Sequence, residues 1–475
     1  MPASLIAHRW SLALSQRNKP AYLAIADAIA DDIRHGFLSL DDKLPPIREL
    51  SKALNLDYTT VARAYNEAQY RGLIFSKPGS GSFVLTRGPA DATLAPSMIE
   101  MTMNMPPEPE LGHLIEQFRR GMKWVSEQGN FHELMRYQDF GGTPEDRAAG
   151  LTWLESLIPH IHSEQILVTP GIQQTLGGLF ANLVGAGHIL CCEDMTYPGV
   201  KAIAAQLGIQ LQGLPMDGDG LLPEAFEDFC QSHTVKALYL NPTIQNPCTL
   251  TIPIGRRLEL IQVARRFGVK IIEDDAYGML PMHKINPFVN LAPDIVYYIT
   301  GLSKTVNAGL RIAYCVCPTS TDCRRLASTL RAGTAMASPF SIRLASRWIA
   351  DGTATLALTQ IRAMGQHRQK LAARYLQNFK FNAHPDGFHI WLHLPDYWSQ
   401  NAFCSELLAR GVAVAGADLF HVNTRVRKAE PTEANGAIDC VRLCLGGPVN
   451  DARIETALQI ISEVLNFRQL QAPPA

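Results

Sequence analysis

The pattern of hydrophobic and polar residues changes near position 99, so the two parts of the chain predict different folds. Upstream, apolar side chains recur at helical spacing, as Tyr22, Ile25 and Ile29 do. Downstream, short apolar runs of strand length, such as HILCCED, VKALYLNP and VKIIEDDAY, alternate with helical patterns. That alternation is typical of an α/β fold with a mainly parallel sheet. The pattern therefore predicts a small helical unit followed by a large α/β unit.

Residues 20–85 read as helix, helix, tight turn, helix and β-hairpin. The second helix covers IRELSKALN, and the third follows the turn LDY with Thr59 or Thr60 as its cap. Two short β runs in LIFSKPGSGSFVL enclose a Gly-rich turn. This order predicts a winged helix-turn-helix, and the alternative is an N-terminal helical cap with a chance hairpin.

A winged helix-turn-helix would contact DNA through its second and third helices and through its wing. Polar and cationic residues stand at outward positions of both helices, and the small residues of the wing tip can approach phosphates closely. The predicted DNA-binding residues are Arg48, Tyr58, Thr59, Thr60, Arg63, Lys77, Gly79, Ser80 and Gly81.

This stretch resembles the GntR type of bacterial transcription regulator. LPPIREL is similar to that family's LPS-x-R-x-LA signature, DYTTVARAY to its recognition helix, and RGLIFSKPGSGSFV to its final turn and wing. The resemblance covers residues 12–85 and implies a DNA-binding domain there. Residues 86–98 are rich in Pro and small residues, so we expect a linker.

In the α/β unit, residues with chemically useful side chains follow the ends of the predicted strands. Gly171, Ile172 and Gln173 open a helix whose free N–H groups can hold an anion. Ligands of open α/β sheets bind beyond the carboxyl ends of the strands, so we expect the side chains there to meet at one edge. Those after the later strands are Tyr197, Asn246, Asp274, Tyr277, Lys304 and Arg311.

Together these residues suit pyridoxal phosphate (PLP). PLP needs an anion site for its phosphate, a carboxylate at its pyridine nitrogen, donors to its phenolic oxygen and a lysine that forms a Schiff base with its aldehyde. Lys304 follows an apolar run, where a lysine must be paired, shifted in pKa or used covalently. We therefore predict Lys304 as the catalytic lysine, and the alternative is a solvated lysine in a surface turn.

Residues 99–470 resemble the fold-type I aminotransferases, and the resemblance implies roles for this set. Asp274 would pair with the pyridine nitrogen, and Tyr277 and Asn246 would donate to the phenolic oxygen. Lys304 would carry the Schiff base. The ring would stack on Tyr197, and the phosphate would be held by Gly171, Ile172, Gln173, Ser303 and Arg311.

Two further roles come from the same resemblance, along with some departures from its pattern. Tyr137, in RYQDFGG, would reach the phosphate of the neighbouring subunit. Arg442, in CVRLCLGG, would bind a ligand carboxylate, and its alternative is a strand-edge arginine. Gly301 stands where a hydroxyl residue commonly precedes the lysine, NPTIQNP lacks the usual Gly, and PDGFHIWL has one glycine where two are common. These departures concern substrate handling more than cofactor binding.

Composition narrows the partners and the compartment. The formal net charge of the 475 residues is −1, so any DNA contact must be local. The ten cysteines form no CxxC pairs and lie mostly in apolar runs, so we expect reduced thiols and no metal site. The sequence carries no signal peptide and no apolar run long enough for a bilayer, which predicts a cytoplasmic protein without a membrane partner.

The two halves together resemble the MocR family of regulators, in which a GntR-like winged helix is joined to a fold-type I aminotransferase-like domain, here residues 99–475 with a smaller C-terminal α+β subdomain. The resemblance implies a head-to-tail homodimer that binds operator DNA and senses PLP or a small amino compound. The alternative is a PLP-dependent aminotransferase with an accessory N-terminal domain, so enzymatic activity stays open. A regulator with a PLP-free relic domain conflicts with the presence of Lys304, Asp274 and Tyr197. The effector, the operator and the sign of regulation do not follow from the sequence.

Overall fold

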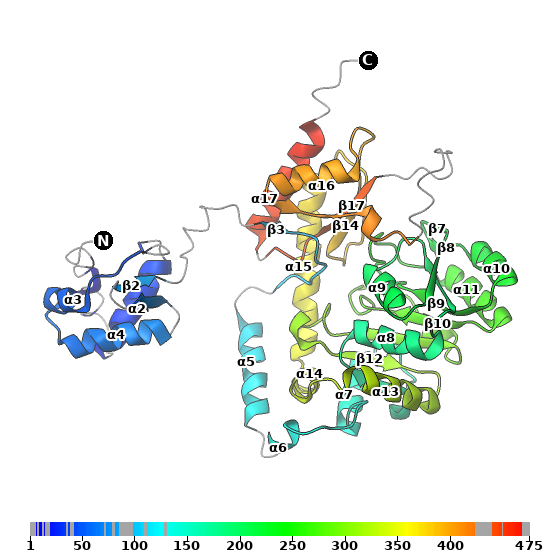
Figure 1. Cartoon of the computed structure of the whole chain (residues 1–475), viewed down its shortest axis with the longest axis horizontal. Helices are drawn as coiled ribbons and strands as arrows, with labels where there is room; N and C mark the ends of the chain where they lie inside the picture. Colours follow the sequence, from blue (N-terminus) through cyan, green and yellow to red (C-terminus); the bar gives the residue numbers. More distant parts are fainter. Residues whose placement is uncertain are drawn as a thin grey trace. The chain divides into compact units, whose positions relative to one another are not determined.

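The chain forms two compact units, Met1–Ser97 and Met98–Ala475 (Figure 1). The computed structural model describes residues 6, 9–11, 14, 20–34, 37–38, 42–70, 73–77, 81–84, 98–108, 112–127, 131–422, 439–448 and 450–467. None of the described helices is long and apolar enough to cross a membrane.

The first unit has the predicted winged-helix order. Its elements are α2 (Ala21–Arg34), α3 (Ile47–Leu54), α4 (Tyr58–Tyr70) and the antiparallel strands β1 (Ile74–Lys77) and β2 (Gly81–Val84). The apolar faces of the helices pack together, with Ile25, Ile29 and Val61 fully buried. The buried hydroxyl of Tyr65 donates to the carbonyl of Pro45 (2.8 Å), which ties α4 to the segment before α3.

The expected cap of the third helix is wrong, because the helix begins before Thr59 and Thr60. Helix α4 begins at Tyr58, and the backbone N–H of Thr60 donates to the carbonyl of Asp57. Thr59 and Thr60 therefore lie inside the first turn of the helix, where their side chains are on its surface rather than at its cap.

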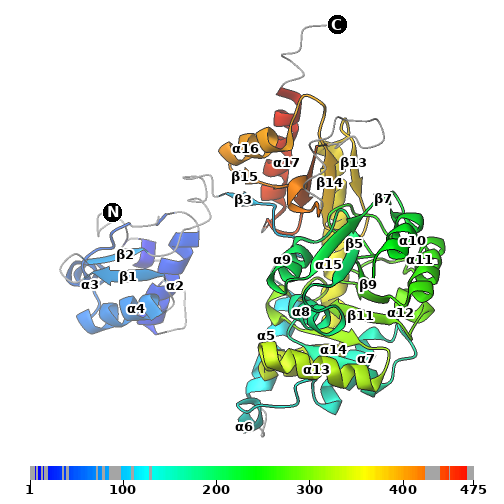
Figure 2. The ribbon, with the colours of Figure 1, turned by 45° about the vertical axis from the view of Figure 1, so that its right-hand side comes forward.

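The second unit is built on a seven-stranded sheet whose strand order is β4-β12-β11-β10-β9-β5-β6. Figure 2 shows three of its strands, β5, β9 and β11. Of the described strands in this sheet, β12 alone runs antiparallel to its neighbours. The strands are β4 (Ile166–Thr169), β5 (Ile189–Glu193), β6 (Gln210–Leu214), β9 (Val235–Leu240), β10 (Lys270–Asp274), β11 (Val296–Gly301) and β12 (Ala313–Val316).

Both faces of this sheet are covered, because alternate strand residues enter two different cores. Leu238 and Tyr298 join the core that also contains residues of α5, α7, α10, α11, α12, α14 and α15. Tyr239 and Tyr297 join the core formed with α8, α9 and α13. The helices are α5 (His113–Ser126), α6 (Phe131–Leu134), α7 (Pro144–Leu154), α8 (Ile172–Leu183), α9 (Pro198–Gln206), α10 (Pro223–Ser232), α11 (Ile254–Phe267), α12 (Phe288–Leu291), α13 (Ser320–Thr334), α14 (Pro339–Ala350) and α15 (Thr353–Tyr375).

A smaller α+β subdomain lies at the C-terminal end of the chain, as expected. Its sheet has the order β13-β14-β17-β16, and a third core packs α15, α16 and α17 against it. The short strand β3 (Ile99–Glu100) returns to this subdomain and pairs in parallel with β15 (Val412–Ala413). Its other elements are β13 (Phe381–Ala383), β14 (His389–His393), β16 (Ala415–Gly416), β17 (Cys440–Cys444), α16 (Gln400–Ala409) and α17 (Asp451–Phe467). Outside this subdomain, β7 (Met216–Asp217) and β8 (Gly220–Leu221) form a separate two-stranded antiparallel sheet.

Candidate functional site

A cavity of about 190 Å³ lies beyond the carboxyl ends of the parallel strands. The sheet topology explains its position, because strand ends of a parallel sheet meet at one edge. The cavity brings together most of the predicted cofactor residues and several unpredicted ones. It is lined by Thr102, Met103, Asn104, Ile172, Gln173, Tyr197, Pro198, Asn241, Asn246, Asp274, Ala276, Tyr277, Gly301, Ser303, Lys304, Arg311 and Arg442.

Lys304 follows β11 and lines this cavity. Its Nζ donates to the backbone carbonyl of Asn104. Burial is the main cause that lowers the pKa of Lys304 to about 8, because desolvation disfavours the ammonium form. About a tenth of the lysine is therefore the neutral, nucleophilic amine at pH 7, far more than for a solvated lysine.

Asp274 ends β10 and has one satisfied and one unsatisfied carboxylate oxygen. The hydroxyl of Tyr239 donates to Oδ2 (2.8 Å), whereas Oδ1 is buried and has no hydrogen-bond partner among the described residues. Burial raises the pKa of this carboxyl group from 3.8 to about 7. A protonated pyridine nitrogen would supply the missing donor, so Asp274 fits the carboxylate that PLP needs.

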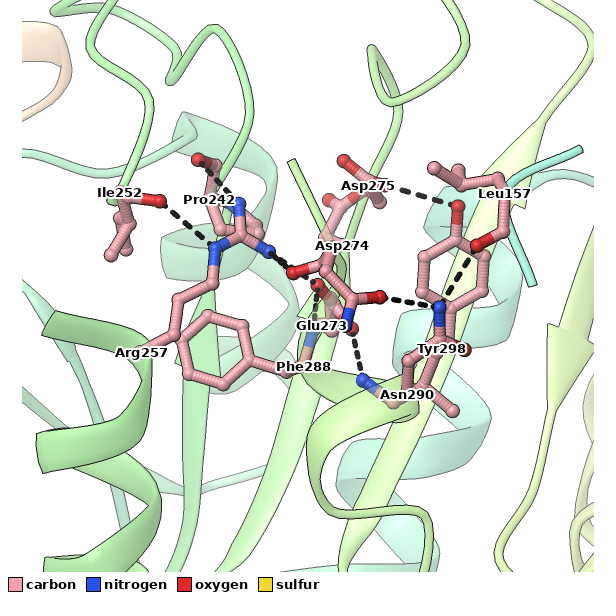
Figure 3. Close-up of polar contacts among 12 residues, drawn as sticks. Leu157, Pro242, Ile252, Arg257, Glu273, Asp274, Asp275, Phe288, Asn290 and Tyr298 are labelled. Atoms are coloured by element: carbon pink, nitrogen blue, oxygen red, sulfur yellow. Dashed lines mark hydrogen bonds and ion pairs between the residues drawn. The ribbon is translucent and has the colours of Figure 1, made fainter. Parts of the chain in front are cut away.

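Glu273, the residue before Asp274 on β10, belongs to a second group of charged side chains (Figure 3). Arg257 and Glu273 form an ion pair of 3.3 Å, and both side chains are at most 1% exposed. Glu273 also accepts from the backbone N–H groups of Phe288 (2.9 Å) and Val289 (3.0 Å). Burial raises the pKa of the Glu273 carboxyl group, and the Arg257 guanidinium and the two backbone donors oppose that rise. The same contacts hold the strand that carries Asp274 in place.

Gly171, Ile172 and Gln173, which are predicted to hold a phosphate, lie at the start of α8. Gly171 precedes the helix with a φ of +92°, a backbone conformation that favours glycine. The Thr175 hydroxyl donates to the carbonyl of Gly171 (2.9 Å), which closes the turn. The Arg311 guanidinium lies against Gly171, because a Cβ built there would be 3.5 Å from Nη2. A helix N-terminus beside a guanidinium suits a phosphate, and Ser303 lines the same cavity.

Three side chains are placed to contact a flat ring. Tyr197 caps the start of α9, and its ring occupies the space beside Gly199. The Asn246 Oδ1 accepts from Arg442 Nη1 (2.6 Å), so the amide hydrogens of Asn246 remain available as donors. Tyr277 is buried with its hydroxyl accepting from Asn104 Nδ2 (2.9 Å). Their stacking and donor roles towards PLP stay predictions.

Arg442 lies in the middle of β17, opposite Trp391 and Ala415 of the neighbouring strands. It is 5% exposed and lines the cavity. Its Nη2 donates to the Thr102 carbonyl, and its Nε is buried without a partner among the described residues. A guanidinium in such a place suits a carboxylate ligand, because a carboxylate accepts two parallel N–H bonds.

The predicted residues outside the cavity divide into two groups. Tyr137 is 82% exposed and does not line its own chain's cavity, so its role towards a neighbouring subunit stays a prediction. In the winged helix, Arg48, Tyr58, Thr59 and Arg63 are exposed. The remaining positions are Thr60, which is half-buried, Gly81, which is exposed, Lys77, whose side chain is outside the described part, and Gly79 and Ser80, which lie outside the described residues.

Some residues of the site were missed. Asn241 directly follows β9, and its Nδ2 donates to the carbonyl of Asp274 (2.6 Å), so its position after a strand could have indicated it. Tyr239 lies inside a strand and Asn104 lies in an irregular segment, so no sequence pattern indicated that either residue belongs to the site. His389 at the start of β14 contacts Asn104 and was likewise not indicated by any pattern.

Comparison with known proteins agrees with this architecture. The family model "Aminotransferase class I and II" matches residues 96–461, which is most of the chain. The chain belongs to this family. The model "Bacterial regulatory proteins, gntR family" matches residues 21–84, so a GntR helix-turn-helix domain is fused to the aminotransferase class I and II domain.

Similar curated proteins are named as regulators. The uncharacterized HTH-type transcriptional regulator YdeF of Bacillus subtilis is 27% identical over 96% of this chain and 97% of that protein. The vitamin B6 salvage pathway transcriptional repressor PtsJ of Salmonella typhimurium is 26% identical over 93% of this chain and 98% of its own length. "Probable rhizopine catabolism regulatory protein MocR" of Rhizobium meliloti is 26% identical over 63% of this chain and 66% of its own length.

Solved structures show the fold of the larger unit. LysN, the α-aminoadipate aminotransferase of Thermus thermophilus complexed with N-(5'-phosphopyridoxyl)-L-leucine, superposes with a TM-score of 0.69 at 20% identity, over 79% of this chain and 94% of LysN. The similarity shows a fold-type I aminotransferase architecture for the larger unit.

Proposed function

We propose that this protein is a PLP-dependent transcription regulator that binds operator DNA through its winged helix and senses PLP, or an amino compound together with PLP, in its larger unit. The observation that carries the proposal is the cavity itself. The cavity is lined by the desolvated Lys304 and by Asp274, one of whose carboxylate oxygens has no partner among the described residues. The same chain carries a GntR-type winged helix. The vitamin B6 connection in the name of PtsJ agrees with a PLP-sensing role.

The residues divide the tasks of holding PLP between them. When bound, PLP supplies an aldehyde that reacts with amines and a ring that withdraws electrons. Lys304 provides an amine for that aldehyde, and Asp274 holds a proton on the pyridine nitrogen. Tyr197 covers the ring, and Tyr277 and Asn246 donate to its phenolic oxygen. The phosphate is held by Gly171, Ile172, Gln173, Ser303 and Arg311.

Arg442 defines the chemical class of the effector. Its buried guanidinium faces the cavity, so an amine that also carries a carboxylate or another anionic group would be recognised. The effector would bias one arrangement of the protein, and the winged helices would grip or release an operator accordingly.

The proposed assembly is a head-to-tail homodimer in the cytoplasm. A dimer would supply the two helix-turn-helix units that paired half-sites need. It would also bring the exposed Tyr137 of one subunit to the phosphate of the other. The domain bounds proposed here are 12–85 for the winged helix, 86–98 for the linker and 99–475 for the PLP-binding unit.

A second candidate function is that of an aminotransferase with an accessory DNA-binding domain. Lys304 and Asp274, the two groups that this chemistry requires, both line the cavity. The fused GntR domain favours regulation, because an aminotransferase needs no winged helix.

A visible-absorption titration of the purified full-length protein tests the proposal. PLP is added first, followed by a panel of amino acids and other small amines, and each mixture is followed over time. A stable spectral shift with one amine, together with a changed affinity for operator DNA, would support a sensor. Steady loss of the PLP band with release of a keto acid would favour the aminotransferase.

A further inference from the structure

The segment 98–105, named here the strap, leads from the linker into the cavity. It begins with Met98, where the larger unit begins, and β3 anchors it to the small subdomain. The backbone N–H of Met101 donates to the carbonyl of Ala413 (2.9 Å), and the carbonyl of Met101 accepts from the N–H of Cys444 (3.0 Å). Beyond Met101, the strap enters the cavity with Thr102, Met103 and Asn104.

Backbone carbonyls of the strap accept hydrogen bonds from the two cationic side chains that a ligand would use. The carbonyl of Thr102 accepts from Arg442 Nη2, and the carbonyl of Asn104 accepts from Lys304 Nζ. A ligand carboxylate at Arg442 competes directly with the first contact. A ligand that reacts with or displaces the lysine amine competes with the second.

The side chain of Asn104 is fixed between two partners. Its Nδ2 donates to the hydroxyl oxygen of Tyr277 (2.9 Å) and lies 3.2 Å from Nδ1 of His389. The Nε2 of His389 is 3.3 Å from the carbonyl of Gln245, which can only accept, so Nε2 carries the hydrogen and Nδ1 is an acceptor. Burial lowers the pKa of His389 to about 3, which keeps the ring neutral in this tautomer.

The contacts of Asn104 determine where the hydroxyl hydrogen of Tyr277 can point. Because Tyr277 accepts from Asn104, its own hydroxyl hydrogen is free to point at another acceptor. The side-chain Oδ1 of Asn104 is buried and has no partner among the described residues, which marks this amide as oriented by its donors and not by its oxygen. Tyr277 lines the cavity, so this hydrogen would be available to the phenolic oxygen of a bound PLP.

We propose that Asn104 is a positioning residue that directs the Tyr277 hydroxyl towards PLP and links ligand occupancy of the cavity to the strap. A ligand carboxylate that takes Arg442 releases the carbonyl of Thr102, and the strap then loses one of its holds in the cavity. Since the strap continues directly from the linker, its release alters the start of the larger unit. This inference rests on the proposed PLP-binding function and names the contacts that connect the ligand to the strap.

The cavity end is tested with Asn104→Asp and Asn104→Ala in the full-length, PLP-loaded protein. An aspartate accepts the Tyr277 hydrogen and so removes the donor from the phenolic oxygen, whose deprotonated form becomes less stable. The pH at which the visible band of bound PLP titrates should rise by about one unit, a tenfold change in proton affinity. Asn104→Ala, which removes the restraint, should give a shift in the same direction.

Asn382→Asp is the matched control. The Oδ1 of Asn382 contacts Nε2 of His393 (3.1 Å) at an exposed position of β13, so the same chemical change is made beside a histidine outside the cavity. It should leave the PLP titration unchanged. If both Asn104 variants bind PLP and titrate like the unsubstituted protein, the positioning role is wrong.

The strap end is tested by hydrogen–deuterium exchange of peptides covering 98–105. The probes are N-(5'-phosphopyridoxyl)-L-leucine, which carries a carboxylate, and pyridoxamine phosphate, which does not. We expect amide exchange in the strap to be at least fivefold faster with the first probe than with the second. Equal exchange with both bound probes would overturn the link to the strap while leaving PLP binding intact. Failure of the protein to bind PLP at all would instead refute the proposed function, and this inference with it.

Discussion

The unsatisfied carboxylate of Asp274 makes a prediction about the stability of the PLP-free protein. Burial raises the pKa of this group from 3.8 to about 7 in the folded chain, so the folded state binds the proton more tightly than the unfolded state. Its stabilising contribution is complete below pH 4 and is lost as the pH rises to 7. One pKa unit corresponds to 1.36 kcal/mol, so the loss amounts to about 4 kcal/mol.

Replacing Asp274 with asparagine removes this pH dependence. The amide keeps an acceptor for the Tyr239 hydroxyl and cannot ionise. Between pH 5 and pH 8 the unsubstituted protein should therefore lose about 2–3 kcal/mol of unfolding free energy relative to Asp274→Asn. Other titrating groups, including the buried His389, are present in both proteins and cancel in the difference.

Urea unfolding of the two PLP-free, full-length proteins at pH 5 and pH 8 measures this difference. Asp219→Asn, at an exposed turn between β7 and β8, is the control and should change stability by less than about 0.5 kcal/mol at either pH. A difference between the unsubstituted protein and Asp274→Asn that is the same at both pH values would refute the reasoning. Saturating PLP should abolish the pH-dependent loss in the unsubstituted protein, because the pyridine nitrogen pairs with the carboxylate.

Three further predictions follow from the same contacts. Lys304→Ala should remove the visible band of lysine-bound PLP without unfolding the protein, and an unchanged spectrum would exclude this lysine. Arg63→Ala should weaken operator binding about tenfold in fluorescence anisotropy at moderate salt with no change in PLP affinity, so full retained affinity would remove this arginine from the interface. Arg257→Leu should cost about 3–5 kcal/mol in denaturant unfolding by leaving Glu273 buried without its cation, and the double variant with Glu273→Leu should recover part of that loss. A single variant as stable as the unsubstituted chain would contradict the last prediction.

The sequence predicts the cavity well wherever a residue directly follows a strand of the main sheet. Asp274 and Lys304 could be placed in this way, because β10 and β11 are parallel and end at the same edge. The winged helix could be predicted for a similar reason, since its three helices have clear apolar faces and its hairpin has a Gly-rich turn. In both cases local patterns and the global fold agree.

The rest of the cavity comes from contacts between distant segments, which no local pattern encodes. Asn104 lies 200 positions from Lys304 and reaches it through an irregular segment. His389 begins a strand of a different sheet, and its neutral state depends on burial rather than on sequence neighbours. The sequence predicts Thr59 or Thr60 as the cap of α4 because threonines are common caps. The helix instead begins at Tyr58, so both threonines lie inside it.

Gly301, which departs from the aminotransferase pattern, shares its volume with a residue of another element. A Cβ at position 301 would be 3.1 Å from the side chain of Ile172, so the branched side chain at the start of α8 fills the space that a hydroxyl residue before the lysine would need. The two positions are therefore epistatic. Gly301→Ser would require the Ile172 side chain to shift by a few tenths of an ångström, and Ile172→Ala would remove that requirement. A substitution at position 172 therefore changes which residues position 301 accepts on a route between a sensor cavity and an enzyme cavity.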